Sequence, residues 1–123
     1  MIRHGEEPFL ECSSRGDKRF SAFFARIRSR DNKSIEEIYQ AAKIFPDGST
    51  GLTWREAKGK KATNQEEVCQ LYSQLWNEYM EENPTLLRII LNVSGVQDIF
   101  GQEGHCCQAT ELWRIRNDTR RSL

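Results

Sequence analysis

The sequence predicts an α+β fold: one predominantly helical domain with a small β-sheet near the N-terminus. Three observations support this. Apolar residues recur at helical spacing through 68–80 and 86–93. The aromatic run at 20–27 is short and compact, as in a strand. Finally, 123 residues are enough for one hydrophobic core but not for two full domains.

The N-terminal part of the chain is expected to contain the sheet. Residues 1–18 mix charges, glycines and a proline without any period, so we expect an extended or irregular lead-in. The strand at 20–27 comes next, and a turn at 30–32 would fold it back. The single globular domain is therefore expected to span 19–117, followed by a disordered basic tail at 118–123.

The helices are predicted from their caps. Ser34 and Glu37 form a capping box that begins a helix running to about Ile44, before a turn at 46–49. A second helix is expected after Asn64, with Glu67 completing a capping box at its start. A third is expected after Asn83, with Pro84 in the first helical position and Gly95 ending the helix. The last is expected from about His105 to Asn117.

Composition excludes several broad classes of function. Lysine and arginine number 18, as do aspartate and glutamate, so no global charge draws the protein to nucleic acid or an anionic membrane. Any anion site must come from a local cluster. The longest apolar run, at 86–91, is interrupted by Arg88 and is too short to span a membrane, and the N-terminus lacks a signal-peptide pattern. We therefore expect a cytoplasmic protein without a membrane partner.

The four cysteines show no C-x-x-C spacing, which favours reduced, packed thiols in a reducing compartment. His105 stands beside Cys106 and Cys107, but the only other histidine is His4, and a closed zinc site needs several convergent ligands. We expect neither a metal nor a cofactor.

Glu36 and Asp98 are the candidate catalytic residues. On a helical wheel, Glu36 and Lys43 lie at the edge of the apolar arc of 35–43, whereas Glu37 points away. A carboxyl group bordering the core can have a perturbed pKa. The alternative is that Glu36 only forms an ion pair with Lys43 or with another cation at the rim of the core.

Asp98 lies in a segment flanked by Gly95 and Gly104, and glycines permit the tight backbone that aims a side chain. The alternative is a turn or capping aspartate. Phe100 could stack on a base or belong to the core. Two carboxylates beside aromatic surface are the minimum equipment for cleaving a glycosidic bond.

Cationic groups for a phosphate cluster after Trp54, at Arg55, Lys58, Lys60 and Lys61. Trp54 is suited to stacking on a purine, with burial in the core as the alternative. The cluster itself could also be only a solvated loop. In the last helix Arg116 falls inside the apolar arc, so it is expected to find an acidic partner or a ligand phosphate.

Taken in order, these segments resemble the NADAR family. The matching segments are F-S-A-F-F at 20–24, I-E-E-I-Y-Q-A-A-K at 35–43, a tryptophan near the middle, D-I-F-G at 98–101 and L-W-R-I-R at 112–116. Proteins of this family are linked to NAD and ADP-ribose metabolism, and they include N-glycosidases that act on ADP-ribosylated guanine or related ADP-ribosides. The resemblance covers about residues 19–117.

The resemblance implies a function and a set of site residues. Glu36 matches the glutamate of the family's E-H-x-Y-Q-A-x-K motif, Trp54 its central tryptophan, and Asp98 the aspartate of D-x-W-G. Glu36 would orient or activate water, and Asp98 would stabilise positive charge at the ribose anomeric carbon. The partner would be an ADP-ribose-containing small molecule or an ADP-ribosylated nucleic acid. The residues expected to bind it are Phe20, Tyr39, Lys43, Trp54, Arg55, Lys58, Phe100, Gly101 and Arg116.

The chain departs from the family pattern at several positions. Glu37 stands where the family has histidine and Phe100 where it has tryptophan, and 106–109 replaces a glycine-containing stretch. A relative that has lost these groups could keep the pocket without the catalysis. Two alternative functions follow: a non-catalytic module that binds an NAD-derived nucleotide, and a protein-interaction domain whose aromatic residues are all in the core.

Overall fold

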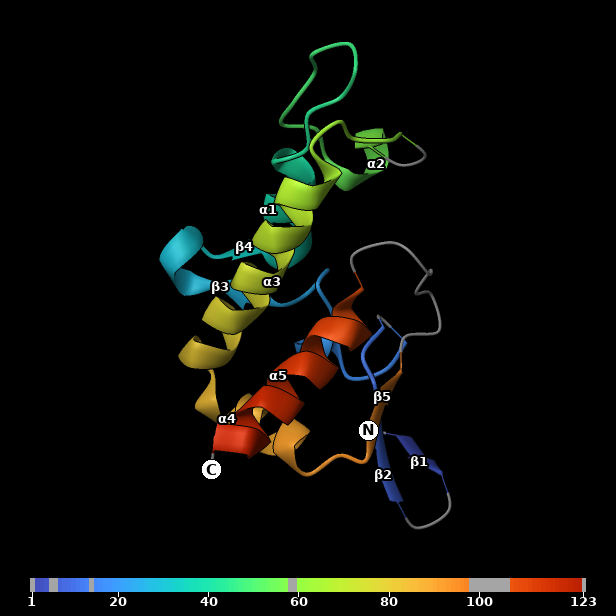
Figure 1. The fold of residues 1–123 in the computed structure, drawn as a ribbon, viewed down its shortest axis with the longest axis vertical. Helices are drawn as coiled ribbons and strands as arrows, with labels where there is room; N and C mark the ends of the chain where they lie inside the picture. The colour runs from blue at the N-terminus through green and yellow to red at the C-terminus, as the bar shows by residue number, and fades with distance from the viewer. Residues whose placement is uncertain (1, 5–6, 14, 58–59, 98–106, 123) are drawn as a thin grey trace.

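The computed structural model has the predicted α+β fold, with helices forming most of the chain and short strands forming two small sheets (Figure 1). It describes residues 2–4, 7–13, 15–57, 60–97 and 107–122. The helices are α1 (Ile35–Ala41), α2 (Trp54–Ala57), α3 (Gln65–Glu82), α4 (Pro84–Leu91) and α5 (Gln108–Ser122).

The first sheet joins the N-terminal strands to a strand that precedes α5. Strand β1 (Ile2–His4) pairs antiparallel with β2 (Glu7–Glu11), and β2 pairs in parallel with β5 (Gly95–Gln97). The lead-in predicted as extended or irregular for 1–18 is therefore extended at these strands, but their pairing into a sheet was not predicted. Strand β2 pairs locally with β1, but its other partner, β5, lies far along the chain, so no local period marks that pairing.

The second sheet is a hairpin of β3 (Arg26–Ile27) and β4 (Lys33–Ser34). Its turn lies where it was predicted, and Asp31 and Asn32 occupy the left-handed region there with φ of 59° and 57°. The strand predicted over 20–27 is mostly wrong, because only its last two residues pair. Residues 18–20 instead form a 3₁₀ turn, η1 (Lys18–Phe20).

Helix α1 begins as predicted but ends earlier. Ser34 Oγ accepts a hydrogen bond from the Glu37 amide at 3.1 Å, and Glu37 Oε1 accepts one from the Ser34 amide at 3.2 Å, so the capping box is confirmed. The helix ends at Ala41 rather than Ile44. The reason is Asn64, whose side chain accepts from the Ile44 amide at 2.9 Å and donates to the Ala42 carbonyl at 3.1 Å. Asn64 therefore does not make the side-chain cap predicted for α3.

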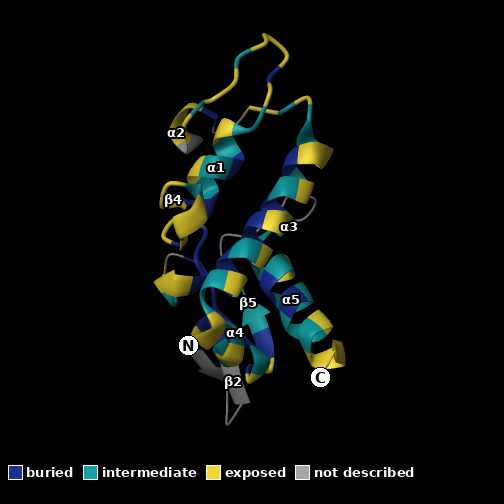
Figure 2. Cartoon of the chain, turned by 90° about the vertical axis from the view of Figure 1, so that its left-hand side faces the viewer, coloured by how far each residue is buried: buried dark blue, intermediate teal, exposed yellow. Residues whose placement is uncertain are grey.

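Helices α3 and α4 form the predicted core. Their apolar stripes are buried, and α3 packs against α1, α4 and α5 (Figure 2). Gly95 does not stop α4, which ends at Leu91; Gly95 instead opens β5. The side chains with 0% exposure are Leu10, Cys12, Phe20, Ser21, Ile27, Ile35, Leu75, Trp76, Ile90 and Leu112.

Helix α5 continues through most of the tail that was expected to be disordered. Asp118 explains this extension, because it pairs with Arg114 at 3.7 Å and with Arg121 at 3.4 Å along the helix, and its carbonyl accepts from Ser122 Oγ at 3.1 Å. The predicted tail is therefore helical through Ser122.

Two further predictions concern the whole chain. Within the described ranges, no helix is both long and apolar enough to cross a membrane. The expectation of four reduced thiols is wrong for Cys69, which is disulfide-bonded, and its partner lies outside the described residues.

Candidate functional site

The candidate site is built where residues 21–25, the first turn of α1 and the start of α5 meet. The Glu36 amide donates to the Ala22 carbonyl at 3.0 Å. The Ala22 amide in turn donates to Oε1 of Gln108, a buried side chain in the first turn of α5, at 2.7 Å. Ala22 is therefore fixed from both sides, and the backbone of Glu36 is held against it.

The Glu36 carboxyl group is half-buried on α1. Its Oε1 accepts a hydrogen bond from Gln40 Nε2 at 2.7 Å, one helical turn further on. Burial raises its pKa above the ordinary value of 4.5, and the Gln40 hydrogen bond and the Lys43 charge oppose this only in part. The carboxyl group can therefore hold or release a proton nearer to neutral pH than an exposed glutamate.

Lys43 and Tyr39 lie beside Glu36, as the helical wheel predicted. Lys43 Nζ lies 4.7 Å from the centre of the Tyr39 ring, and burial lowers the Lys43 pKa, with Glu36 opposing the shift. Among the described residues Lys43 and Glu36 form no ion pair within 4.0 Å, so simple pairing does not explain Glu36.

Tyr39 belongs more to the core than to the surface. Its ring packs on Tyr72 of α3 with centroids 4.9 Å apart, and its hydroxyl accepts from Gln65 Nε2 at 3.2 Å. Burial raises the pKa of Tyr72 well above its ordinary value, and the charge of Glu36 adds to this. Tyr39 is 7% exposed, so its ring packs in the core and anchors α1 there.

The pKa of Glu36 predicts a pH-dependent stability. Since folding raises this pKa, the carboxyl group favours the folded state below its unfolded pKa, and that contribution is lost as the pH rises through the folded pKa. From about pH 4 to pH 8 the wild type should therefore lose stability relative to Glu36→Gln. The loss should be about 1.4 kcal/mol per unit of pKa difference, measured by urea unfolding.

Glu78 provides a control of opposite sign. The Arg30 guanidinium donates two hydrogen bonds of 2.8 Å to it and holds its pKa below the ordinary value. The contribution of Glu78 to the stability of the fold is present above its unfolded pKa and is lost as the pH falls through its folded pKa. The wild type should therefore gain stability relative to Glu78→Gln as the pH rises toward the ordinary value of 4.5, below the range in which the Glu36 contribution is lost. A Glu36 trend parallel to that of Glu78 would contradict the prediction.

Two predicted binding residues are placed elsewhere. Phe20 is 0% exposed and lies in the core, so its side chain supports the site rather than facing a ligand. Arg116 does not find the predicted acidic partner among the described residues. It lies over the Trp113 ring at 4.4 Å and donates to Asn117 Oδ1 at 2.7 Å.

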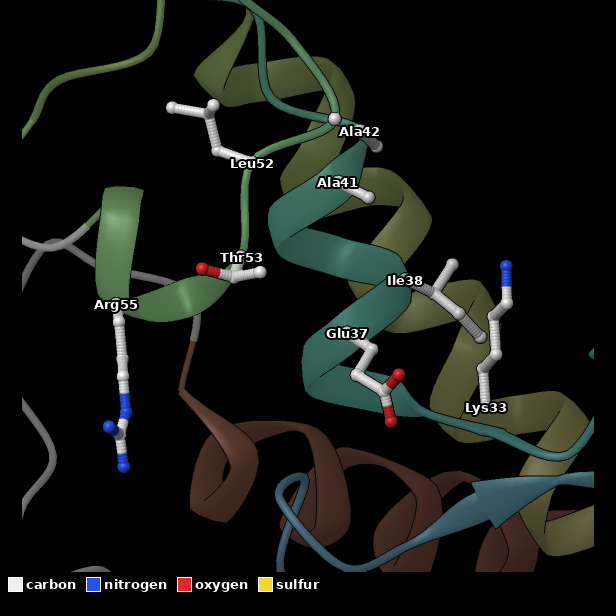
Figure 3. Close-up of a pocket in the computed structure, with 9 residues that line it drawn as sticks. Lys33, Glu37, Ile38, Ala41, Ala42, Leu52, Thr53 and Arg55 are labelled. Atoms are coloured by element: carbon white, nitrogen blue, oxygen red, sulfur yellow. The ribbon is translucent and has the colours of Figure 1, made fainter.

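Arg55 borders an open groove of about 670 Å³ between α1 and α2 (Figure 3). Glu37, Ile38 and Leu52 also line this groove, and Glu36 does not. The loop predicted around Arg55 is partly the short helix α2, so Arg55 and Glu36 are not brought together in one cavity by the described residues.

The other predicted site residues cannot be placed. Asp98, Lys58, Phe100 and Gly101 lie outside the described residues, as does the side chain of Trp54, whose backbone begins α2. The convergence of Glu36 and Asp98 therefore stays a prediction.

The sequence did not single out Glu11, a carboxylate that is only 2% exposed at the end of β2. Its Oε2 accepts from the Ser13 amide at 3.0 Å and its Oε1 from Gln97 Nε2 at 3.1 Å. Gln97 ends β5, directly before the segment that carries Asp98. No signal could have found Glu11, because it lies in a segment without periodicity.

Within the described part of the chain, no group of three or more histidine, cysteine, aspartate or glutamate side chains could hold a metal ion. No family model matches this chain, and no curated protein matches it significantly.

Proposed function

We propose that the protein is an N-glycosidase that hydrolyses an ADP-riboside, with Glu36 as the residue that activates or orients the attacking water. The observation that supports this is the environment of Glu36: a half-buried carboxyl group with a raised pKa, held by Gln40 at 2.7 Å. A general acid or base works best when its pKa lies near the working pH. Asp98 is proposed as the second carboxylate, at the ribose anomeric carbon.

Glu36 is also held in a defined direction. Its backbone is bonded to Ala22 and its side chain to Gln40, so its position is fixed at both ends. Lys43 supplies a positive charge on the same face of α1 without pairing with Glu36, and an ammonium group there suits a phosphate of the substrate. This combination supports hydrolysis better than a purely structural role for Glu36.

The experiment is a product assay. The protein is incubated with ADP-ribosylated guanosine, with an oligonucleotide carrying the same adduct, and with NAD, and the released ADP-ribose is measured by chromatography. Glu36→Gln should lower the turnover of the accepted substrate by at least about a hundredfold, because it removes the proton-transfer group without changing the shape of the side chain.

Glu37→Gln is the matched control. Glutamine at this position can still complete the capping box with Ser34, so α1 stays intact. Its turnover should remain close to that of the wild type. Turnover by Glu36→Gln equal to that of the wild type would rule out the proposed role.

A second candidate is a module that binds an NAD-derived nucleotide without cleaving it. The capping box favours this candidate, because Glu37, which stands where the resembled family has histidine, uses its carboxylate on the Ser34 amide. It cannot replace a catalytic imidazole while it does so. Calorimetry with ADP-ribose and NAD, beside the product assay, separates the two: binding without turnover supports the second.

A further inference from the structure

Residues 21–25 form a turn, here called the aromatic turn, that presents two phenylalanines to solvent. Phe23 is 43% exposed and Phe24 is 47% exposed. Burying rings of this size stabilises a protein substantially, so two large exposed rings in sequence are a feature that a partner can use.

The aromatic turn is firmly held from within. The amides of Phe24 and Ala25 donate to the Ser21 carbonyl at 3.0 and 2.8 Å, and the Ala25 carbonyl accepts from the Ile35 amide at 2.9 Å. The bonds of Ala22 to α1 and α5 fix its other side. The rings are therefore displayed on a fixed base, which lowers the ordering cost of binding.

The surrounding segment is strongly basic in a chain of zero net charge. Residues 15–33 contain seven lysines and arginines but only two aspartates. Two of the arginines pair with α3: Arg28 approaches Glu82 at 3.7 Å and Arg30 bonds Glu78. Two more are paired closer by, because Arg19 bonds Asp17 at 2.7 Å and Arg26 approaches Glu37 at 3.7 Å. The positive potential that attracts a polyanion therefore comes from the other three cations of the segment.

Three of these cations, Arg15, Lys18 and Lys33, make no ion pair with any residue that the structure describes. Lys18 is the best placed of them, because its Nζ lies 4.9 Å from the centre of the Phe24 ring. An exposed ring and an unpaired cation thus stand side by side, one suited to a base and the other to its phosphate.

We propose that the aromatic turn, together with Lys18, binds single-stranded nucleic acid. Aromatic rings on a positively charged surface are how proteins hold unpaired strands, because every base offers a face to stack on. Two rings in sequence suit two consecutive bases. A free mononucleotide is instead held mostly in enclosed pockets, and these rings are on open surface.

This inference goes beyond the proposed hydrolase and does not depend on it. It does bear on the site, because Phe23 directly follows Ala22, whose carbonyl accepts from the Glu36 amide.

The test is fluorescence anisotropy with a labelled oligothymidylate, which contains no ADP-ribose, so its result is independent of hydrolysis. The wild type should bind the strand, with an affinity that falls as salt rises. Phe24→Ala should bind about tenfold more weakly or worse. Lys18→Gln should lower the slope of log affinity against log salt by about 0.7.

Two further variants keep the result interpretable. Ile44→Ala removes an apolar side chain of similar exposure, 44%, outside the turn, and should bind like the wild type. Phe24→Leu keeps the apolar bulk without the aromatic face, and should lose affinity as Phe24→Ala does.

Several results would overturn the proposal. The first is a wild type that does not bind the strand. The second is a Phe24→Leu variant that binds normally, which would indicate apolar contact with a protein. The third is binding of AMP that weakens as much as strand binding does when Phe24 is replaced, which would indicate a mononucleotide site.

Discussion

Gly16→Ala is expected to destabilise the fold by roughly 3 to 5 kcal/mol, because a methyl group there would overlap the backbone of β2. An added Cβ would lie 1.9 Å from the Glu11 carbonyl oxygen and 2.6 Å from its carbon, and both are backbone atoms that cannot turn aside. Relief would require breaking the bonds from the Gly16 amide to the Ser13 carbonyl at 2.9 Å and from the Asp17 amide to Glu11 at 3.0 Å. Urea unfolding followed by far-UV circular dichroism measures the loss.

Gly48→Ala is the control for this prediction. Gly48 has a φ of +84°, so alanine is strained there, but nothing lies within 4 Å of the added Cβ. Its cost should be only about 1 to 2 kcal/mol, the usual penalty of the left-handed region for alanine. A loss at Gly16 no larger than that at Gly48 would contradict the predicted collision with the Glu11 backbone.

Trp76→Ala is expected to cost about 3 to 5 kcal/mol, the usual range for deleting a buried tryptophan. Trp76 is 0% exposed in α3 and stands edge-on to Tyr72 and Tyr79, with ring centroids 6.4 and 5.7 Å away. Its removal leaves a cavity between α3 and the elements that pack on it, and it ends both aromatic contacts. The midpoint of urea unfolding should fall accordingly.

Trp113→Ala provides the comparison within the same chain. Trp113 is half-buried on α5 and carries the Arg116 guanidinium on its face. Its loss should cost about 1 kcal/mol, because the remaining surface can be solvated and no closed cavity forms. A larger effect at Trp113 than at Trp76 would contradict the assignment of the core.

Local signals predicted the parts of the fold that depend on neighbours in sequence. The period of α3 and the Ser34–Glu37 capping box were both confirmed, because their partners lie within a few residues. A capping signal of the same kind gave a wrong prediction at Asn64. Its side chain could cap α3 or bond the end of α1, and only the fold decides that it bonds the Ala42 carbonyl.

Contacts between distant segments could not be predicted in this way. Strand β2 has its partner in β5, and Ala22 has its partner in Gln108, so neither leaves a periodic pattern. For the site, the helical wheel placed Glu36 beside Lys43 at the edge of the core, as the structure has it. The bond from Gln40 to Glu36 follows the same spacing, but the burial that raises the pKa comes from other elements.

The parallel pairing of β2 with β5 has a consequence for synthesis of the chain. While the ribosome is still making the middle of the protein, β2 has emerged but its partner does not yet exist. The α1–α3 contact can form earlier, from residues closer in sequence. Closure of the first sheet, and with it the anchoring of Gln97 next to Glu11, must therefore await the translation and emergence of β5.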